Sequence, residues 1–384
     1  MEIKKIDFNN MDEKTKGYIK IGIIVIGLFI GLLLFMAIIK LFIGNVVAFD
    51  KIENIMVRAA DQYMLQHEDK FNMNEPNEIL EINTSDLVVE GYMKEFSKYT
   101  AKDVMCNGKV LVVRNDENIS YIPKLDCGDA YKYKELVEVL VDESNIVTEE
   151  SGLYKIETEA PYYMYKGEYP NNFVKYAGKM WRIMKINEDN NIQLIYDEKL
   201  DNVSWDDRFN VEKENYIGIN EFEGVQPCRI KDSVVAFYND EEFLSKKDKS
   251  LIVPQQVCIG KRSKTDFDNS GSIECSVKSE LMGLGLINLS EYFQTSLDSN
   301  CVGLSSFACS NYNYLSKYRT PFWTSTANSE NSYEAYYVDS YASNANAVRV
   351  LFVRPTAVIN GKINFKSGTG TEDDPYIIEA NTVK

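Results

Sequence analysis

The longest apolar stretch of the chain lies near its first residues. Residues 21–39 contain no charged side chain, and three more apolar residues follow Lys40. At a helical rise of about 1.5 Å per residue, this length spans a hydrocarbon core roughly 30 Å thick. The pattern predicts a transmembrane helix over residues 21–43, with Lys40 reaching the far headgroups. Gly27 and Gly31 have the small-xxx-small spacing that lets helices pack closely, which could support a homo-oligomer.

Lysines gather on the N-terminal side of the apolar stretch. They are Lys4, Lys5, Lys14, Lys16 and Lys20. Because the cytoplasmic flank of a membrane helix carries the excess of Lys and Arg, we expect residues 1–20 to form a cytoplasmic tail. The later part of the chain would then be extracellular, and the protein a single-pass protein of the cell membrane. The alternative is a cleaved signal peptide that ends at residues 46–48, although the apolar core is long for one.

An amphipathic pattern follows the apolar stretch. Apolar side chains recur at helical spacing between residues 45 and 67. We therefore expect one helix to continue out of the bilayer as a stalk over residues 44–68. Residues 69–82 are polar and contain a proline, which ends that helix.

The pattern after the stalk predicts a small α+β domain over residues 69–150. Ser85 and Asp86 are residue types that cap a helix, and the helix is expected to end near Phe96. Two short strands follow it. A Glu-Glu-Ser-Gly turn at residues 149–152 marks the predicted domain boundary.

The pattern from residue 151 onward is that of a mixed domain rich in short strands. Residues 175–198 form the clearest β-hairpin, with two alternating strands around an Asn/Asp-rich turn. Residues 241–244 and 281–294 predict short helices. In residues 322–378, short apolar runs alternate with turns rich in Ser, Asn and Tyr. The fold class is therefore α+β, with residues 151–384 as its largest domain.

Charge narrows the range of partners. The chain has 58 acidic and 42 basic residues, for a net charge of −16. Nucleic-acid binding needs clustered Lys and Arg, so an acidic outer region argues against it. The same acidity disfavours docking of this region on an anionic membrane surface.

Cysteine positions indicate disulfide bonds in an oxidising compartment. All seven cysteines follow the membrane stretch, and no Cys-x-x-Cys spacing occurs. With a single histidine, His67, a structural zinc site is not expected. Short intervening loops favour three disulfide pairs, which are Cys106–Cys127 at the open end of a hairpin, Cys258–Cys275 and Cys301–Cys309. Cys228 is then left without a partner among these pairs and is either free or paired in another arrangement.

Several segments resemble one family of membrane-anchored surface proteins from low-GC Gram-positive-type bacteria, whose large domain has no assigned function. The segments include residues 152–195, MGLGLINLSEYF (282–293), VRPTAVI (353–359) and GTGTEDDPYII (368–378). The WRI hairpin, EY helix, WTST strand and VRP strand resemble the arrangement of C-type-lectin-like folds, which formylglycine-generating enzymes share. The resemblance implies a C-type-lectin-like domain over residues 151–384.

The preceding region resembles a small pilin-like unit. The similarity lies in the stalk, in GYMKEFSK (91–98) and in the hairpin of residues 106–129. The processing signal of type IV pilins is missing, because the chain has GYIKIG at residues 17–22. The resemblance therefore implies the shape of a pilin-like unit more than assembly into a pilus.

One acidic loop has part of a calcium-binding pattern. Asp266, Asp268 and Ser270 place oxygens at positions 1, 3 and 5, and a glycine follows. Glu274 occupies position 9, but position 12 is Val277 where a bidentate glutamate is needed. Calcium binding is one interpretation. A solvated polar loop tied by Cys258–Cys275 is the other.

The predicted recognition surface is rich in tyrosine and asparagine. Such residues offer contact area together with adaptable hydrogen bonding, as in antibody loops, and ordinary exposed turns are the alternative interpretation. The expected ligand is an extracellular glycan or protein. The candidate residues are Tyr312, Tyr314, Tyr333, Tyr336, Tyr337, Tyr341 and Asn344.

No catalytic set is visible in the sequence. A single histidine near the membrane cannot serve a His-based triad in the large domain. Trp181, Trp323 and Arg354 are expected to be structural. The leading hypothesis is a non-catalytic surface protein for binding or adhesion. The alternatives are a pilin-like assembly subunit and an extracellular enzyme, for which a pair of carboxylates would suffice.

Overall fold

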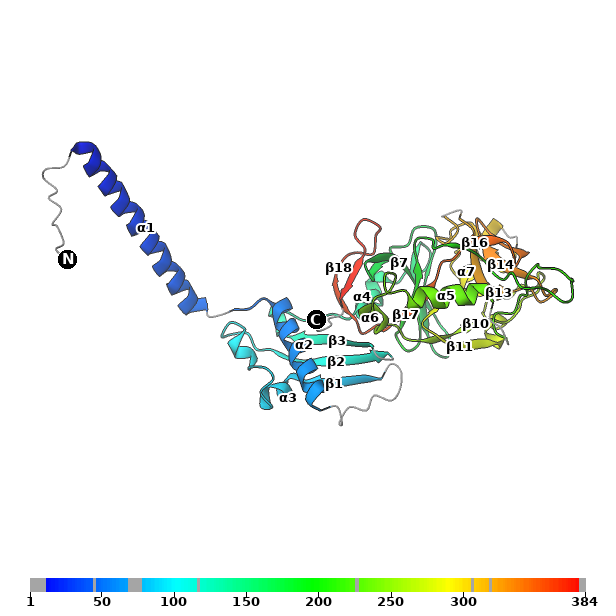
Figure 1. The fold of residues 1–384 in the computed structure, drawn as a ribbon, viewed down its shortest axis with the longest axis horizontal. Helices are drawn as coiled ribbons and strands as arrows, with labels where there is room; N and C mark the ends of the chain where they lie inside the picture. The colour runs from blue at the N-terminus through cyan, green and yellow to red at the C-terminus, as the bar shows by residue number, and fades with distance from the viewer. Residues whose placement is uncertain are drawn as a thin grey trace.

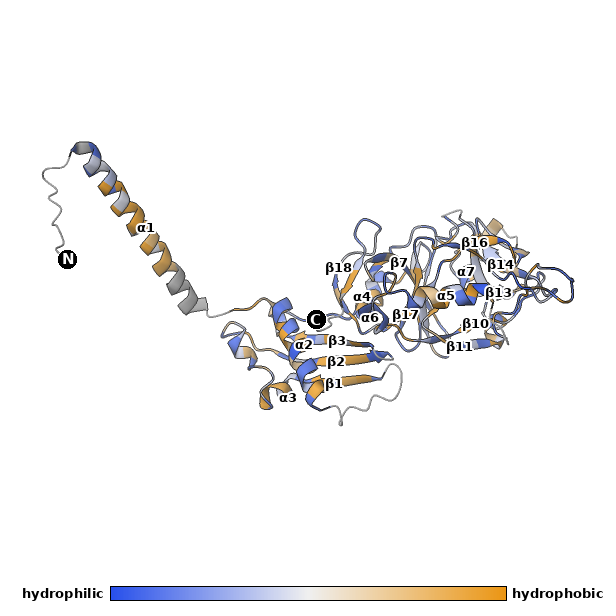
Figure 2. Cartoon of the chain, in the orientation of Figure 1, coloured by the Kyte–Doolittle hydropathy of each residue, from blue (hydrophilic) through white to orange (hydrophobic). Residues whose placement is uncertain are grey.

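The computed structural model describes residues 12–43, 46–67, 78–115, 118–224, 228–304, 307–317 and 320–379. Lys4, Lys5 and most of the polar segment 69–82 lie outside the described residues. Helix α1 (Glu13–Ile43) is the long first element in Figure 1, and Figure 2 shows its middle as strongly hydrophobic. It is long and apolar enough to cross a membrane, and none of its apolar window is buried.

Helix α1 begins earlier than the apolar pattern predicts. The Asp12 carboxylate accepts a hydrogen bond from the Thr15 backbone N–H at 2.9 Å, which satisfies one of the free donors of the first turn. The polar residues before the apolar stretch are therefore helical, because they have their own cap.

Helix α2 (Phe49–Gln66) is separate from α1. Residues 46–48 are not helical, so the expectation of one continuous stalk is wrong. The buried face of α2 includes Ile52, Met56, Ala60 and Tyr63, which pack in one hydrophobic cluster with residues of a small sheet. The amphipathic pattern predicted the helix correctly, but its apolar face packs within a folded unit.

The small sheet has three antiparallel strands. Their order is β1 (Ile79–Asn83), β2 (Asn107–Asn115) and β3 (Asn118–Asp126). Helix α3 (Thr84–Val89) follows β1 and ends well before Phe96, where the sequence placed its end. Cys106–Cys127 closes the open end of the β2–β3 hairpin, as predicted.

This sheet lies between two hydrophobic cores. On β2, Val110 and Val112 belong to the cluster that contains α2, whereas Leu111 and Val113 belong to the core of the large domain. Side chains alternate between the faces of a strand, so an uninterrupted apolar run marks a strand covered on both sides. Ile122 of β3 joins the second core.

The large domain is built around a nine-stranded sheet. The main path runs β12-β17-β8-β7-β6-β19-β18, and the β4–β5 hairpin joins at β7. The β7–β8 hairpin confirms the strands predicted within residues 175–198. The strands are β4 (Gly152–Ile156), β5 (Tyr162–Lys166), β6 (Phe173–Tyr176), β7 (Lys179–Ile186), β8 (Ile192–Tyr196), β12 (Leu284–Gly285), β17 (Thr356–Ile359), β18 (Asn364–Ser367) and β19 (Tyr376–Glu379).

A second sheet holds much of the C-terminal alternating segment. Its order is β15-β14-β13-β16-β9, and β13 pairs with β16 in parallel. Trp181, Trp205 and Trp323 are fully buried, as expected for Trp181 and Trp323. The strands are β9 (Asn202–Ser204), β13 (Phe322–Ala327), β14 (Glu334–Val338), β15 (Ala342–Asn346) and β16 (Val350–Phe352).

Short helices and one two-stranded ribbon are the remaining elements of the two folded parts. Residues 241–244 form turns instead of the predicted helix, and only the second half of residues 281–294 is helical. The ribbon is β10 (Gln255–Cys258) with β11 (Lys278–Met282). The helices are α4 (Leu136–Leu140), α5 (Arg229–Asn239), α6 (Lys246–Lys249) and α7 (Leu289–Gln294). The 3-10 turns are η3 (Phe96–Lys98), η4 (Gly128–Ala130), η5 (Glu143–Asn145), η6 (Glu274–Ser276) and η7 (Phe307–Cys309).

The fold is therefore a mixed α+β arrangement with an apolar N-terminal helix and three disulfides. Cys258–Cys275 and Cys301–Cys309 are the pairs that the spacing predicts. Cys228 is buried and unpaired. Burial raises the pKa of its thiol to about 12, so it stays protonated and weakly nucleophilic at neutral pH.

Candidate functional site

A polar groove crosses one face of the nine-stranded sheet. Met164 of β5 pairs with Lys185 of β7, Lys185 pairs with Gln193 of β8, and Gln193 pairs with Val358 of β17. These four residues form a row across neighbouring strands and line two adjoining cavities of about 740 and 380 Å³. Both cavities are lined by Tyr162, Ser270 and Gln294, so they adjoin, and together we call them the groove.

Helix α7 forms one wall of the smaller cavity. Its start is fixed by reciprocal bonds, in which the Asn288 N–H donates to Glu291 and the Glu291 N–H donates to the Asn288 side chain, both at 3.0 Å. This capping box turns the Glu291 carboxylate toward the sheet. There Gln193 Nε2 donates to it at 2.9 Å.

Burial raises the pKa of Glu291, against the lowering effects of the Gln193 hydrogen bond and of Lys185. Lys185 Nζ lies 4.5 Å from the centre of the Tyr162 ring. A carboxylate, an ammonium group, an amide and an aromatic ring thus meet at one end of the groove. Each side chain remains partly exposed to the groove.

The larger cavity combines aromatic rings with a second lysine. Tyr154, Phe293 and Lys166 line it, and Lys166 Nζ lies 5.4 Å from the centre of the Tyr154 ring. Burial lowers the pKa of Lys166. This end of the groove therefore offers flat apolar surface beside a weakly solvated cation.

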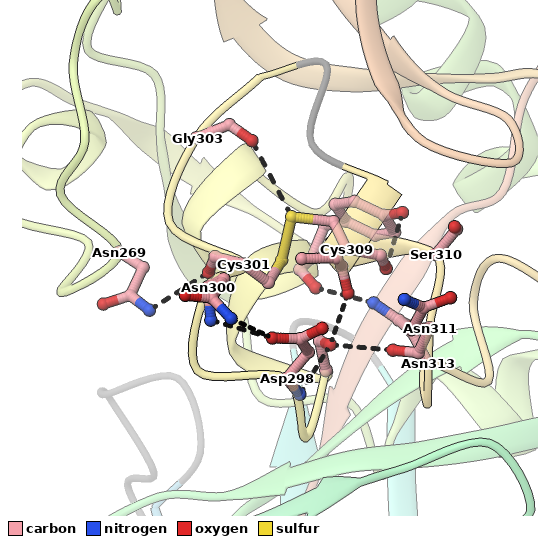
Figure 3. Close-up of a disulfide and its surroundings, with 12 residues drawn as sticks. Asn269, Asp298, Asn300, Cys301, Gly303, Cys309, Ser310, Asn311 and Asn313 are labelled. Atoms are coloured by element: carbon pink, nitrogen blue, oxygen red, sulfur yellow. Dashed lines mark hydrogen bonds between the residues drawn. A yellow bond between two sulfur atoms is a disulfide. The ribbon is translucent and has the colours of Figure 1, made fainter.

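A disulfide lies at one rim of the larger cavity. Cys301 and Cys309 close a short loop, and Asn269 Nδ2 donates to the Cys301 carbonyl at 3.4 Å (Figure 3). Asp298 accepts hydrogen bonds from the backbone and side chain of Asn300. Asn269, Asp298 and Cys301 all line the cavity, so the Cys301–Cys309 disulfide and these hydrogen bonds hold one rim of the groove in place.

The lining is rich in groups that form hydrogen bonds. Cys258, Cys275 and Cys301 line the groove but are in disulfides. Positive and negative side chains are intermixed, which favours a polar ligand of low net charge. The amide side chains of the lining each present donors and acceptors. They are Asn187, Asn191, Gln193, Gln255, Gln256, Asn269, Asn288 and Gln294.

The proposed calcium loop is folded around an arginine. Arg262 Nε and Nη2 donate to the Glu274 carboxylate at 2.9 and 3.1 Å, and both side chains are fully buried. The carbonyls of Asp266 and Asp268 accept from the same guanidinium. The Asp268 carboxylate accepts from Ser270 within the loop.

The loop thus directs several of its oxygens at a guanidinium. In the described part of the chain, no group of three or more His, Cys, Asp or Glu side chains is arranged to hold a metal ion. Calcium binding at Asp266, Asp268, Ser270 and Glu274 stays a prediction. Glu274 would have to leave Arg262 to take part.

The tyrosines of the predicted recognition surface do not share one face. Tyr314 and Tyr336 are fully buried, so they are core residues and cannot contact a ligand. Tyr312 and Tyr341 are exposed, whereas Tyr333 and Tyr337 are half-buried. The prediction is wrong for the two buried residues. The Tyr336 hydroxyl donates to the Arg262 carbonyl, and the Tyr314 ring packs against the buried Arg182 guanidinium.

Asn344 has a structural partner. Its side chain donates to the Glu334 carboxylate at 2.7 Å. Asn328 and Asn331 donate to the same oxygen, and Lys264 Nζ lies 3.3 Å from it. These bonds lower the pKa of Glu334 against the raising effect of burial. The asparagines of this segment therefore hold a hairpin together.

The groove was not predicted from the sequence. Lys185 and Gln193 are polar residues inside otherwise apolar strands, which was a usable signal for a functional face. Arg354 is buried, as expected, and its Nε donates to the Tyr196 carbonyl at 3.0 Å.

Comparison of the chain with protein-family models, curated proteins and solved structures gave no match.

Proposed function

We propose that the protein is a non-catalytic binding protein of the cell surface, anchored by α1. The groove of its large domain would bind an extracellular glycan. The lysines before the apolar stretch favour a cytoplasmic N-terminus, which would place the small unit and the large domain outside the cell. Three disulfides fit that compartment.

The observation that carries the proposal is the lining of the groove. Sugar hydroxyls donate and accept hydrogen bonds, and amide side chains do both. Tyr154 and Tyr162 supply rings on which the apolar face of a sugar can stack. Two adjoining cavities leave room for more than one sugar unit, which suits an oligosaccharide. A C-type-lectin-like arrangement and a pilin-like first unit remain part of this proposal.

The test is a binding measurement on the full-length protein in nanodiscs. Arrayed glycans identify a ligand, and its affinity is then measured for Tyr162→Ala and Gln193→Ala. Loss of a stacking ring or of an amide that lines the groove is expected to weaken binding about tenfold or more, equivalent to about 1.4 kcal/mol.

Tyr216→Ala is the matched control, because Tyr216 is 72 % exposed and lies outside the groove. Its affinity should equal that of the unchanged protein. Binding that survives both groove variants, or that is lost only in the control, would contradict the assignment of the ligand to the groove.

A further inference from the structure

A buried lysine joins the small sheet to the large domain. Lys124 lies on β3, and its side chain is 1 % exposed. Its Nζ lies 2.9 Å from Asn364 Oδ1, 2.5 Å from the Lys362 carbonyl and 3.0 Å from Glu135 Oε1. Lysine side chains are rarely buried to this degree, so the burial of Lys124 calls for a structural or chemical explanation.

Backbone pairing holds the three side chains together. Glu135 and Asn364 form an antiparallel bridge, in which the Leu136 N–H donates to the Ile363 carbonyl at 2.8 Å. Asn364 Nδ2 donates to the Pro123 carbonyl, the residue before Lys124, at 2.6 Å. The carboxamide is thus fixed on both sides. The Lys124 amine thus contacts the oxygen of the amide whose carbon it would attack.

The surroundings make this amine easier to deprotonate than an exposed lysine. Burial lowers the pKa of Lys124, while Glu135 opposes this by raising it. The ring of Tyr133 covers the amine at 4.7 Å from its centre. A neutral lysine amine is a nucleophile, and burial beside a carboxylate that accepts its proton is how proteins activate one.

We propose that Lys124 and Asn364 form an intramolecular isopeptide bond, with Glu135 as the proton carrier. The Lys124 ammonium gives one proton to Glu135 and then, as the neutral amine, attacks Asn364 Cγ, which forms the new C–N bond. The added nitrogen gives a second proton to Nδ2 as the Cγ–Nδ2 bond breaks, and Nδ2 leaves as ammonia. The proton held by Glu135 passes to the ammonia, which departs as ammonium, and Glu135 ends ionised. No oxidant, reductant or further reactant is needed.

The bond would join residues 240 positions apart in the chain. It would connect β3 of the small sheet to β18 of the large domain. Such a link lowers the conformational entropy of the unfolded chain and prevents the two parts from separating. Proximity makes the step feasible, because held reactants gain the equivalent of a very high local concentration.

The first measurement is the intact mass of the full-length protein, followed by tandem mass spectrometry of its proteolytic peptides. We expect a mass lower by one ammonia than the sequence with its disulfides requires. We also expect one branched peptide that joins Lys124 to Asn364. An intact mass equal to the sequence mass, with both peptides recovered unlinked, overturns the proposal.

Two Asn-Gly sequences need a control, because succinimide formation there also releases ammonia. They are Asn107-Gly108 and Asn360-Gly361. Lys124→Arg retains the charge but removes the amine nucleophile, so it should restore the full mass. A mass deficit that persists in Lys124→Arg belongs to a succinimide and counts against the isopeptide bond.

Glu135→Gln tests the proton carrier. Removal of a general acid–base is expected to slow bond formation about a hundredfold or more. Lys109→Arg is the matched control, since Lys109 forms an exposed pair with Glu81 on the same sheet. The Lys109→Arg variant should form the isopeptide bond completely. If the Glu135→Gln variant forms it equally well, Glu135 is not the proton carrier.

Discussion

At the residue scale, the most consequential ion pair is Arg262–Glu274. Removing one member of a buried pair leaves an uncompensated charge, at a cost of about 3–5 kcal/mol. Arg262→Met is expected to lose that much unfolding free energy, measured by denaturant titration of the full-length protein. The carbonyls of Asp266 and Asp268 would also lose their donor.

The control for this change is Arg229→Met. Arg229 pairs with Asp207 on the surface, where both side chains are more than half exposed. Solvent screening makes such a pair worth less than about 1 kcal/mol. If the two variants lose equal stability, the buried pair does not organise the loop.

Calcium offers a separate test of the same residues. Because Glu274 is engaged by Arg262, calcium at millimolar concentration should leave the melting temperature of the protein unchanged. Thermal unfolding with calcium and with a chelator measures this. A rise in melting temperature that Asp268→Asn abolishes would instead establish the calcium loop.

At the element scale, the Cys301–Cys309 disulfide anchors the segment before it, residues 297–301, which lines one rim of the groove. Replacing both cysteines by serine is expected to destabilise the domain by about 2–4 kcal/mol and to loosen the rim. Hydrogen exchange of residues 298–304 should increase, and binding of a groove ligand should weaken with it.

The matched control replaces Cys106 and Cys127, whose disulfide lies in the small sheet. That variant should lose stability without faster exchange at residues 298–304. If hydrogen exchange at residues 298–304 is equally fast in both variants, the Cys301–Cys309 disulfide does not hold the rim of the groove in place.

Local elements were predictable because their determinants are close in sequence. The β2–β3 hairpin and its disulfide follow from alternation and a short loop. Helix α2 was predicted, but its apolar face is equally compatible with a stalk and with a domain core. Residues 241–244 form turns, because the helix in this segment starts later, where the Ser245 side chain caps α6.

The groove could not be predicted in the same way. It brings together β5, β8, β17 and α7, which are distant in sequence, so no window contains its pattern. Tyr336 and Tyr337 illustrate the same limit. Both are tyrosines in one strand, yet only Tyr336 is fully buried, since its hydroxyl reaches the Arg262 carbonyl at 3.0 Å.

At the scale of the whole molecule, the two folded parts share one core. Leu111, Val113 and Ile122 of the small sheet belong to the hydrophobic cluster of the large domain. Asn115 crosses the same boundary, and its Nδ2 donates to the carbonyls of Lys249 and Ile252, both at 2.9 Å. We therefore expect the small unit and the large domain to unfold in one cooperative transition.

Asn115→Ala tests this coupling. It leaves buried carbonyls without a donor, which costs about 1–3 kcal/mol. The cost should appear as a lower midpoint of a single calorimetric transition, because neither part is stable without the other. Glu81→Ala, on the exposed edge strand β1, should leave the midpoint nearly unchanged. Two resolved transitions in the unchanged protein would mean that the parts fold independently, and the shared core would then contribute little to stability.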